Sequence, residues 1–310
     1  MGRSRLPERV LFVVGPTAIG KTELAAHLAR RFDGEVVGAD SRQVYRYMDV
    51  GTAKPPAALR AEIRHHLIDV VDPDEPFDVA RWRAAALDAL AEIEARSKTA
   101  IVCGGTGLYL RSLLRGLFSG PAADEELRRR FADEERKRPG TLRDRLRRVD
   151  PASAERIHPN DMVRTVRALE VYELTGRPLS HWHAEHGLRE RPFQALLIEP
   201  TVAREVLHRR IAERSRAMVR AGLLEEVRQL ARRGYGRELP AFAAIGYREA
   251  WQCLAGELRV EDLAERITVA TRRYARRQLV WLRGQMDTVP VAAGDVSAIE
   301  RLAERFLASH

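Results

Sequence analysis

The chain has 310 residues, enough for one large α/β domain with an insertion or for two domains of ordinary size. Its 45% apolar and 31% charged residues predict a globular protein with a full core, and no apolar run reaches the roughly 18 residues of a membrane-spanning helix. The formal net charge of +9 suits a polyanionic partner, although arginine-rich codon usage explains part of it, because just four of the 53 basic residues are lysines. Two distant cysteines and a first segment unlike a signal peptide predict a cytoplasmic protein without a disulfide framework, a zinc cluster or a membrane anchor.

In the first 117 residues, short apolar runs alternate with amphipathic helical patterns. Buried strands are predicted over Val10 to Val14, Glu35 to Gly38 and Thr99 to Cys103. Helices are predicted over Thr22 to Phe32 and after Asp78, which is placed to be the N-cap of a segment with helical apolar spacing. Strands and helices that alternate in this way are typical of parallel βαβ units.

The pattern changes after residue 117. The segment from Pro121 to Arg191 has no strand pattern and is rich in charge. In AADEELRRRFADEERKR the acids come early and the bases late, which matches a helix dipole, and Pro139-Gly140 ends this helix. Another helix is predicted from about Asp161 to Thr175. Strand character then returns at Phe193 to Ile198, followed by a long arginine-rich helix.

Arginines gather in two late segments. The range from Arg204 to Arg237 carries ten arginines against four glutamates. In RRYARRQ, helical spacing relates Arg272 to Arg276 and Arg273 to Arg277. Several arginines on one helix face can follow a phosphate backbone, so their placement favours a nucleic-acid partner more than the net charge does.

One glycine-rich loop carries a phosphate-binding signature. The run Gly15-Pro16-Thr17-Ala18-Ile19-Gly20-Lys21-Thr22 fits G-x-x-x-x-G-K-[ST] and lies between a predicted strand and a predicted helix. In such a P-loop, backbone N–H groups and the helix N-terminus surround a phosphate, the lysine adds a charge and the Thr22 hydroxyl can bind Mg²⁺. The spacing predicts phosphate binding but does not specify ATP.

The residues after the other strands make an ATP-dependent enzyme less favoured. The strand ending Ile101-Val102-Cys103 runs into glycines and Thr106, without the aspartate that kinases use to hold Mg²⁺. An acid instead follows the second strand, at Asp40. Because the carboxyl ends of parallel strands meet at one edge, we expect Asp40, Thr106 and the P-loop around one crevice. Asp40 could instead be only a turn or N-cap residue.

These patterns together predict an α/β fold class. We expect a P-loop-type three-layer core with a parallel sheet, formed by residues 1–117 and 191–310 and interrupted by a helical insertion domain over 118–190.

Five segments resemble the tRNA dimethylallyltransferases, also called isopentenyl-tRNA transferases. They are GPTAIGKTELA, GADSRQVYRYMDVGTAKP, CGGTGLYLRSLLRG, NDMVRTVRALEVYELTGRPLS and AAIGYREAW. The resemblance runs from about Val10 to Gly284, and the second segment is the most specific because it is long and ordered. It implies transfer of a dimethylallyl group from dimethylallyl diphosphate to the exocyclic N6 amine of the adenosine on the 3′ side of the tRNA anticodon.

The resemblance also implies roles for particular residues. The P-loop residues Gly15 to Thr22 would bind the diphosphate with Arg214, and Thr22 would bind Mg²⁺. Asp40 would be the general base, Thr106 would lie near the reacting amine, and Lys21 would stabilise the leaving group. The residues implied in binding the tRNA anticodon stem-loop are Asp40, Ser41, Arg42, Gln43, Val163, Arg164, Thr165, Val166, Arg167, Ala244, Ile245, Gly246, Tyr247, Arg248 and Glu249. We expect the protein to act as a monomer.

Two positions depart from the family pattern. Ile19 stands where the family commonly has serine, and Val163 stands where it has glutamine, which puts one hydroxyl contact and one RNA contact in doubt. Three alternatives stay open: prenylation of free adenine nucleotides, a P-loop kinase of a small metabolite, and an RNA-binding module with a vestigial P-loop.

Several other residues that could bind a metal, react or stack on a base are expected to have none of these roles. We expect His181, His183 and His186 to lie in a solvated or RNA-facing loop rather than to bind a metal. Cys103 is predicted to be a buried, unreactive thiol, and Trp281 to pack in the core rather than to stack on a base.

Overall fold

The computed structural model describes residues 5–118, 120–187 and 190–309. By their internal contacts these form two compact units, Met1–Leu114 with Arg191–His310, and Arg115–Glu190. We call them the large unit and the helical unit and describe each by itself. Among the described residues, no helix combines the length and the apolar character needed to cross a lipid bilayer.

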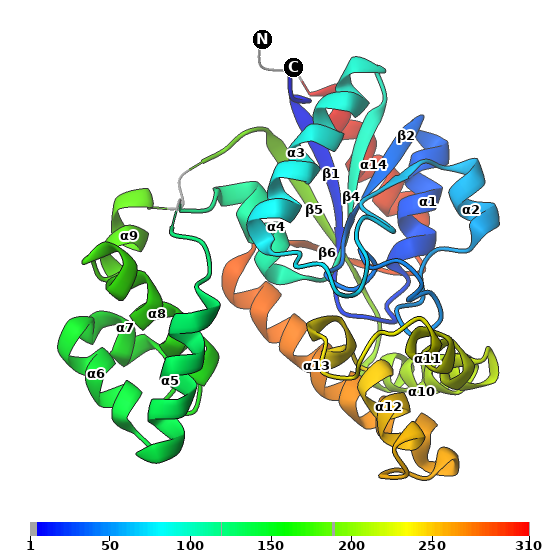
Figure 1. The fold of residues 1–310 in the computed structure, drawn as a ribbon. Coiled ribbons are helices and arrows are strands. Elements are labelled where there is room, and N and C mark those ends of the chain that lie inside the picture. Colours follow the sequence, from blue (N-terminus) through cyan, green and yellow to red (C-terminus); the bar gives the residue numbers. More distant parts are fainter. Residues whose placement is uncertain (1–4, 119, 188–189, 310) are drawn as a thin grey trace. The chain divides into compact units, whose positions relative to one another are not determined.

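The large unit is built on one parallel sheet (Figure 1). Within the described residues the sheet has six strands in the order β3-β2-β4-β1-β5-β6, and every recorded strand pair is parallel. The strands are β1 Arg9–Val14, β2 Gly34–Ala39, β3 His65–His66, β4 Thr99–Gly104, β5 Gln194–Thr201 and β6 Val289–Ala292. This confirms the predicted α/β class with a parallel sheet.

Each face of the sheet is covered by its own helices because successive strand residues point to opposite sides. In β1, Phe12 belongs to the same apolar cluster as Trp82 on one face, whereas Val13 belongs to the cluster with Leu28 and Ile299 on the other. The first face is covered by α3 Val79–Ala95 and α4 Gly107–Arg115, and the second by α1 Lys21–Arg31 and α14 Val296–Ala308 (Figure 1). The result is the expected three-layer core.

A further group of helices lies beyond the carboxyl ends of the central strands (Figure 1). It comprises α10 Arg204–Arg220, α11 Leu223–Arg232, α12 Tyr247–Leu254 and α13 Leu263–Gln285, with short 3-10 turns at Pro240–Ala243 and Val260–Asp262. A short helix, α2 Ala57–Glu62, precedes β3. Ligands of open α/β sheets bind at this end of the strands, so these helices are placed to enclose a site.

Most predicted elements agree with the structure to within one or two residues at the ends predicted for them. The Asp78 carboxylate accepts a hydrogen bond from the backbone N–H of Arg81 (2.9 Å) and caps α3, as expected. The strands β3 and β6 were not predicted. Both lie at edges of the sheet and are short, and β6 alternates partly buried with exposed residues, so neither gives the apolar run of a buried strand.

The helical unit packs around a small apolar core centred on Phe131, Leu142 and Leu169. Its helices are α5 Glu125–Lys137, α6 Thr141–Val149, α7 Pro151–Arg156, α8 Met162–Thr175 and α9 Leu179–His186. Glu170, on α8, is fully buried and is paired with Arg128 (2.8 Å) and Arg167 (2.5 Å). A buried carboxylate without such partners would be costly, so these arginines are structural.

One sequence expectation in this unit is wrong. His181, His183 and His186 lie on helix α9 and not in a loop. Pro178 is the N-cap residue of this helix, and Gly187 ends the helix in a left-handed conformation. Among the described residues, no three His, Cys, Asp or Glu side chains gather in a metal-binding group.

Candidate active site

The P-loop connects β1 to α1 and leaves the start of the helix open. Gly20, the N-cap, has φ 104°, and no side chain caps the first amides of α1. Ala18 also has a left-handed φ of 63°, which a non-glycine residue adopts only when its surroundings hold it there. Uncapped amides at a helix N-terminus bind anions, and this is the chemistry that the sequence pattern predicts.

Ile19 points away from this anion site and into a small apolar cluster. Its side chain is 3% exposed and packs with Leu207 and Ile211 of α10 and with Ala275 of α13. Arg210 of α10 donates a hydrogen bond to the carbonyl oxygen of Ile19 (3.1 Å). The departure from the family pattern at position 19 therefore adds apolar packing between the P-loop and two distant helices.

Lys21 and Arg214 bring two positive charges to the same site. The Lys21 ammonium donates to the carbonyl oxygen of Pro16 (2.7 Å), and Arg214 donates to that of Thr52 (3.5 Å). Burial lowers the pKa of Lys21 to about 8, and the nearby Arg214 contributes to this shift. Burial likewise lowers the pKa of Arg214. Among the described residues neither cation has an ion-pair partner, so an anion within reach of both would offset their lost hydration.

Asp40 follows β2 and has two different carboxylate oxygens. Oδ1 accepts hydrogen bonds from the backbone N–H groups of Arg42 (2.8 Å) and Gln43 (3.4 Å). In the described part of the chain no group donates to Oδ2. Asp40 is thus a turn residue, as one interpretation of the sequence held, and it also lines a cavity. The bonds to Oδ1 fix the side chain while Oδ2 stays free to accept a proton.

Thr106 supports the same turn from the end of β4. Its hydroxyl oxygen accepts a hydrogen bond from the backbone N–H of Ser41 (3.0 Å). Its own N–H donates to the carbonyl oxygen of Ala39 (3.1 Å). The expected approach of Asp40, Thr106 and the P-loop to one edge of the sheet is therefore present in the geometry.

The loop that follows Asp40 is held by buried polar contacts. The ammonium of Lys54, with 2% of its side chain exposed, donates to the Tyr45 carbonyl (2.7 Å) and to Asp49 (2.7 Å) and Asp69 (2.5 Å). The Gln43 amide donates to the carbonyl oxygen of Thr52 (3.2 Å). Several residues of the segment GADSRQVYRYMDVGTAKP, which carries the family resemblance, therefore hold this loop in one conformation.

A distant glutamate anchors the same loop from α11. The carboxylate of Glu226 accepts hydrogen bonds from the backbone N–H groups of Asp49 (2.9 Å) and Val50 (2.8 Å) and from the hydroxyl of Tyr247 (2.5 Å). A Cβ on Gly51 would lie 2.4 Å from the Tyr247 ring, so only glycine fits at this position. The sequence analysis missed Glu226 because nothing local distinguishes it from the surface glutamates of an amphipathic helix.

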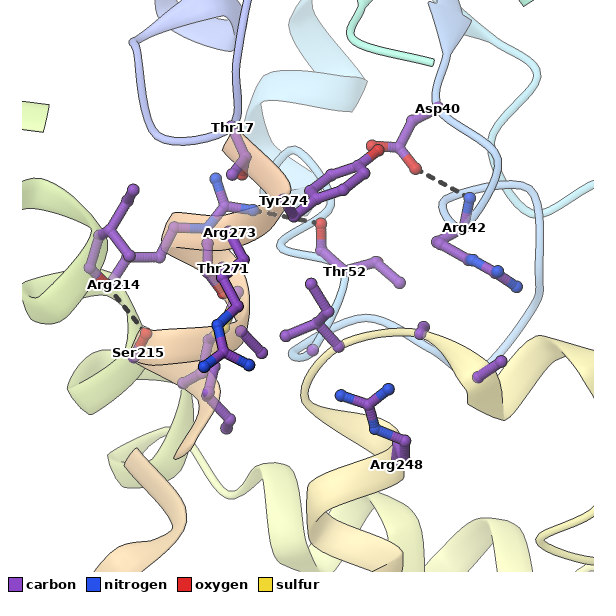
Figure 2. Close-up of a pocket in the computed structure, with 18 of the residues that line it drawn as sticks. Thr17, Asp40, Arg42, Thr52, Arg214, Ser215, Arg248, Thr271, Arg273 and Tyr274 are labelled. Atoms are coloured by element: carbon purple, nitrogen blue, oxygen red, sulfur yellow. Dashed lines mark hydrogen bonds between the residues drawn. The ribbon is translucent and has the colours of Figure 1, made fainter. Parts of the chain in front are cut away.

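These elements enclose a cavity of about 460 Å³ in the large unit (Figure 2). It is strongly basic. The charged residues that line it, among those described, are Asp40, Arg42, Arg214, Arg248, Arg273 and Arg277. Other lining residues include Thr17 of the P-loop, Thr52, and the apolar side chains of Ile211, Met218, Ile245 and Ile267. The cavity therefore has positive charges that can bind an anion and an apolar wall that can contact a hydrocarbon group.

Tyr274 of α13 also lines the cavity and was not predicted as a site residue. In Figure 2 its ring extends toward Asp40. Burial raises the pKa of Tyr274 to about 12, with the negative charge of Asp40 adding to the rise and a hydrogen bond with Thr106 opposing it. The hydroxyl therefore stays protonated at neutral pH. The available signal was its place inside RRYARRQ, which the sequence analysis treated only as a basic helix face.

The residues expected to bind tRNA fall into two groups. In the large unit, Asp40, Ser41, Arg42, Ala244, Ile245 and Arg248 line the cavity. Tyr247 and Glu249 are buried, and Glu249 caps α12 by accepting a hydrogen bond from the backbone N–H of Gly246 (2.7 Å). Gln43 is committed to the loop described above. A role in RNA binding for this segment stays a prediction.

The other group lies at the first turns of α8 in the helical unit. Val163 is 82% exposed, and the Arg164 side chain is 72% exposed. Thr165 is fully buried, and Val166 packs partly buried against the core of this unit. Arg167 donates to Glu170 and to the carbonyl oxygen of Pro121 (2.8 Å). Val163 and Arg164 are therefore the members of this group that reach solvent freely.

A comparison with known protein families identifies the family of this chain. A family model described as IPP transferase matches residues 43–285. The chain belongs to the IPP transferase family. Within this family, a tRNA dimethylallyltransferase of Anaeromyxobacter dehalogenans is 50% identical over 299 residues, covering 96% of this chain and 99% of the relative.

Two solved structures extend the comparison to the fold. The full-length tRNA isopentenylpyrophosphate transferase of Bacillus halodurans has a TM-score of 0.72 and 35% identity, covering 97% of each chain. A eukaryotic dimethylallyltransferase solved acting on tRNA has a TM-score of 0.81 and 29% identity, covering 97% of this chain and 80% of that one. This IPP transferase therefore shares its fold with its relatives over nearly its whole length.

Two further side chains of this IPP transferase, Cys103 and Trp281, were expected to have no role in catalysis or in base stacking. Cys103 is only partly buried, but desolvation raises the pKa of its thiol to about 12 while Lys21 opposes the rise, so the thiol stays protonated at neutral pH. Trp281 packs, partly buried, against the apolar cluster of the large unit. A Cβ on Gly107 would lie 2.3 Å from its ring.

Proposed function

We propose that this protein transfers the dimethylallyl group of dimethylallyl diphosphate to the exocyclic N6 amine of the adenosine 3′-adjacent to the anticodon of tRNA. Membership in the IPP transferase family and the names of the relatives support this activity. The observation that carries it is the pair of partly buried cations, Lys21 and Arg214, which have no ion-pair partner among the described residues and lie beside the open amides of the P-loop.

The diphosphate is the group that this charge pattern fits. The P-loop amides and Lys21 would hold one phosphate while Arg214 neutralises charge on the other. As the carbon–oxygen bond to the diphosphate breaks, negative charge grows on the leaving oxygen and positive charge on the allylic carbon. Cations placed before the reaction stabilise that leaving group most when the bond is breaking. The apolar lining of the cavity suits the five-carbon group.

Proton transfer is assigned to Asp40. The adenine amine is a weak nucleophile because its lone pair is delocalised into the ring. As nitrogen bonds to the allylic carbon, the free Oδ2 of Asp40 would take the amine proton, a step worth about 10²–10⁴-fold. Thr106 keeps the turn that bears Asp40 in place, and we assign it a hydrogen bond near the reacting amine. The products are the modified tRNA, the diphosphate and one proton.

Mg²⁺ is proposed as the metal that accompanies the diphosphate. This ion prefers substrate oxygens and water with one or two protein ligands, and the Thr22 hydroxyl in the first turn of α1 is the protein ligand we assign. When bound, the ion would neutralise charge on the diphosphate. The lack of a carboxylate cluster among the described residues fits an ion held mainly by substrate.

The acceptor is proposed to be the tRNA anticodon stem-loop. The five cavity arginines, the exposed Arg164 and the relative solved acting on tRNA support a polyanionic acceptor. A base in a loop leaves its stack more easily than one in a duplex, so it can enter a cavity. We propose that the protein acts as a monomer in the cytoplasm.

Incorporation of labelled dimethylallyl diphosphate tests this function. The protein is incubated with the labelled donor, Mg²⁺ and unmodified tRNA, with AMP and ATP as acceptors in parallel reactions. The matched control is the same tRNA with the adenosine beside the anticodon changed to another base. We expect label in the first tRNA and none in the control.

Two other outcomes would correct the proposal. Label in AMP or ATP but not in tRNA would keep the prenyl transfer and change the acceptor. No transfer to any acceptor, with ATP consumed instead, would identify a kinase.

A further inference from the structure

Gln278 of α13 joins two loops that are far from it in the sequence. Its side-chain carbonyl oxygen accepts a hydrogen bond from the backbone N–H of Thr17 in the P-loop (2.9 Å). Its side-chain nitrogen donates to the carbonyl oxygen of Gly105, after β4 (2.9 Å). The residue is 8% exposed, so both bonds are largely sheltered from water. The Gln278 side chain thus links the P-loop to the loop that follows β4.

The glycines after β4 leave room for this contact. A Cβ on Gly105 would lie 2.4 Å from the Gln278 side-chain nitrogen and 2.7 Å from the carbonyl oxygen of Gly15. Three residues further along α13, Trp281 fills the space that a Cβ on Gly107 would need. Residues three apart lie on one helix face, so α13 presses a single face against this loop.

We propose that Gln278 is a positioning residue that holds the P-loop in the conformation that binds the diphosphate. It occupies the Thr17 N–H, so the diphosphate would be bound by other amides of the P-loop. It also fixes the loop that bears Thr106 against the P-loop. This inference rests on the proposed function because it assigns a role in binding that donor.

The same helix also lines the cavity. Tyr274 and Arg277 of α13 are cavity residues, and Gln278 directly follows Arg277. The helix that faces the substrates is therefore tied by Gln278 to the loop that would hold the leaving group. A change at Gln278 should alter binding of the diphosphate more than binding of tRNA.

The test is the affinity for inorganic pyrophosphate with Mg²⁺, measured by calorimetry on the full chain. Gln278→Met keeps the length of the side chain and removes both hydrogen bonds. We expect its Kd for pyrophosphate to rise about tenfold, with the Kd for tRNA changed less than about twofold. The KM for dimethylallyl diphosphate should rise in parallel. Gln285→Met, at an exposed position of the same helix, is the matched control and should change neither constant.

A purely structural role gives a different result. A lower Tm for Gln278→Met with an unchanged Kd for pyrophosphate would overturn the inference and leave the proposed function intact. Failure of the unaltered protein to bind pyrophosphate would overturn both. Should the methionine variant not fold, Gln278→Asn provides the same measurement, because it keeps the amide but withdraws it by one methylene group. An unchanged Kd in that variant would equally contradict the inference.

Discussion

The cavity of the large unit and the first turns of α8 differ in how their functional side chains are held. Around the cavity, Asp40 and Gln278 are fixed by hydrogen bonds to backbone groups. On α8, the Arg164 side chain is largely exposed, and its one ion pair among the described residues is with Asp161, at 3.4 Å. Fixed groups suit a reaction that needs exact placement, whereas a free arginine suits contact with a phosphate backbone. We therefore expect changes in the cavity to affect turnover and changes on α8 to affect tRNA affinity.

Removal of the proposed base is the strongest test of this contrast. Asp40→Ala should lower turnover by about 10²–10⁴-fold because no other group is assigned to take the amine proton. The Kd for tRNA should change little. Single-turnover transfer with saturating tRNA measures the first quantity, and filter binding the second. Unchanged turnover would remove Asp40 as the base.

Removal of the second cation should produce the next largest effect. Arg214→Ala should lower kcat/KM for dimethylallyl diphosphate by on the order of 10²-fold, since a preformed contact to the leaving group is lost. Arg214→Lys keeps a charge but loses the planar guanidinium, and it should recover part of the loss. A result in which only tRNA binding weakens would move Arg214 from the donor site to the acceptor site.

Binding of pyrophosphate should depend on pH through Lys21. With a pKa of about 8, about nine in ten Lys21 side chains are charged at pH 7 and about one in ten at pH 9. The anion binds the charged form, so affinity should fall as the pH rises through 8, by up to about tenfold. Calorimetry across this range, in buffers of different ionisation enthalpy, should detect proton uptake on binding. In Lys21→Met the affinity should be weaker and independent of pH over the same range.

The smallest effects are expected on α8, where the two arginines should separate. Arg164→Ala should weaken tRNA binding severalfold and reduce its salt slope by about one, while thermal stability stays unchanged. Arg167→Ala removes one partner of the buried Glu170 and should cost about 1–3 kcal/mol of stability in the helical unit. Salt titrations and thermal unfolding of both variants measure the two effects. An identical response of both would contradict the contrast between a solvent-exposed and a structural arginine.

The sequence allowed the P-loop, Asp40 and the central strands to be predicted because each has a local signal. Strand β1 is a continuous apolar run, and the P-loop follows it with glycines at a fixed spacing. Asp40 could be singled out because an acid after a buried strand points to the ligand-binding edge of the sheet. Each of these predictions rests on residues that lie close together in the sequence.

The contacts that complete the site had no such signal. Gln278 lies 261 residues from Thr17, and Glu226 lies 177 residues from Asp49. On their own helices both look like ordinary polar residues of an amphipathic pattern. Helix α9, Leu179–His186, was missed for a related reason, because the proline before it and the glycine after it suggested a loop rather than helix ends.

The attachment of the P-loop to α13 has a consequence for biosynthesis. The P-loop and Asp40 are synthesised well before α13, and Gln278 is added 261 residues after Thr17. A nascent or prematurely terminated chain that ends before α13 contains every assigned phosphate ligand, yet its P-loop lacks the brace across to β4 and its cavity lacks a wall. Such a chain should be inert toward cellular diphosphates and tRNA, so activity is withheld until α13 has been synthesised.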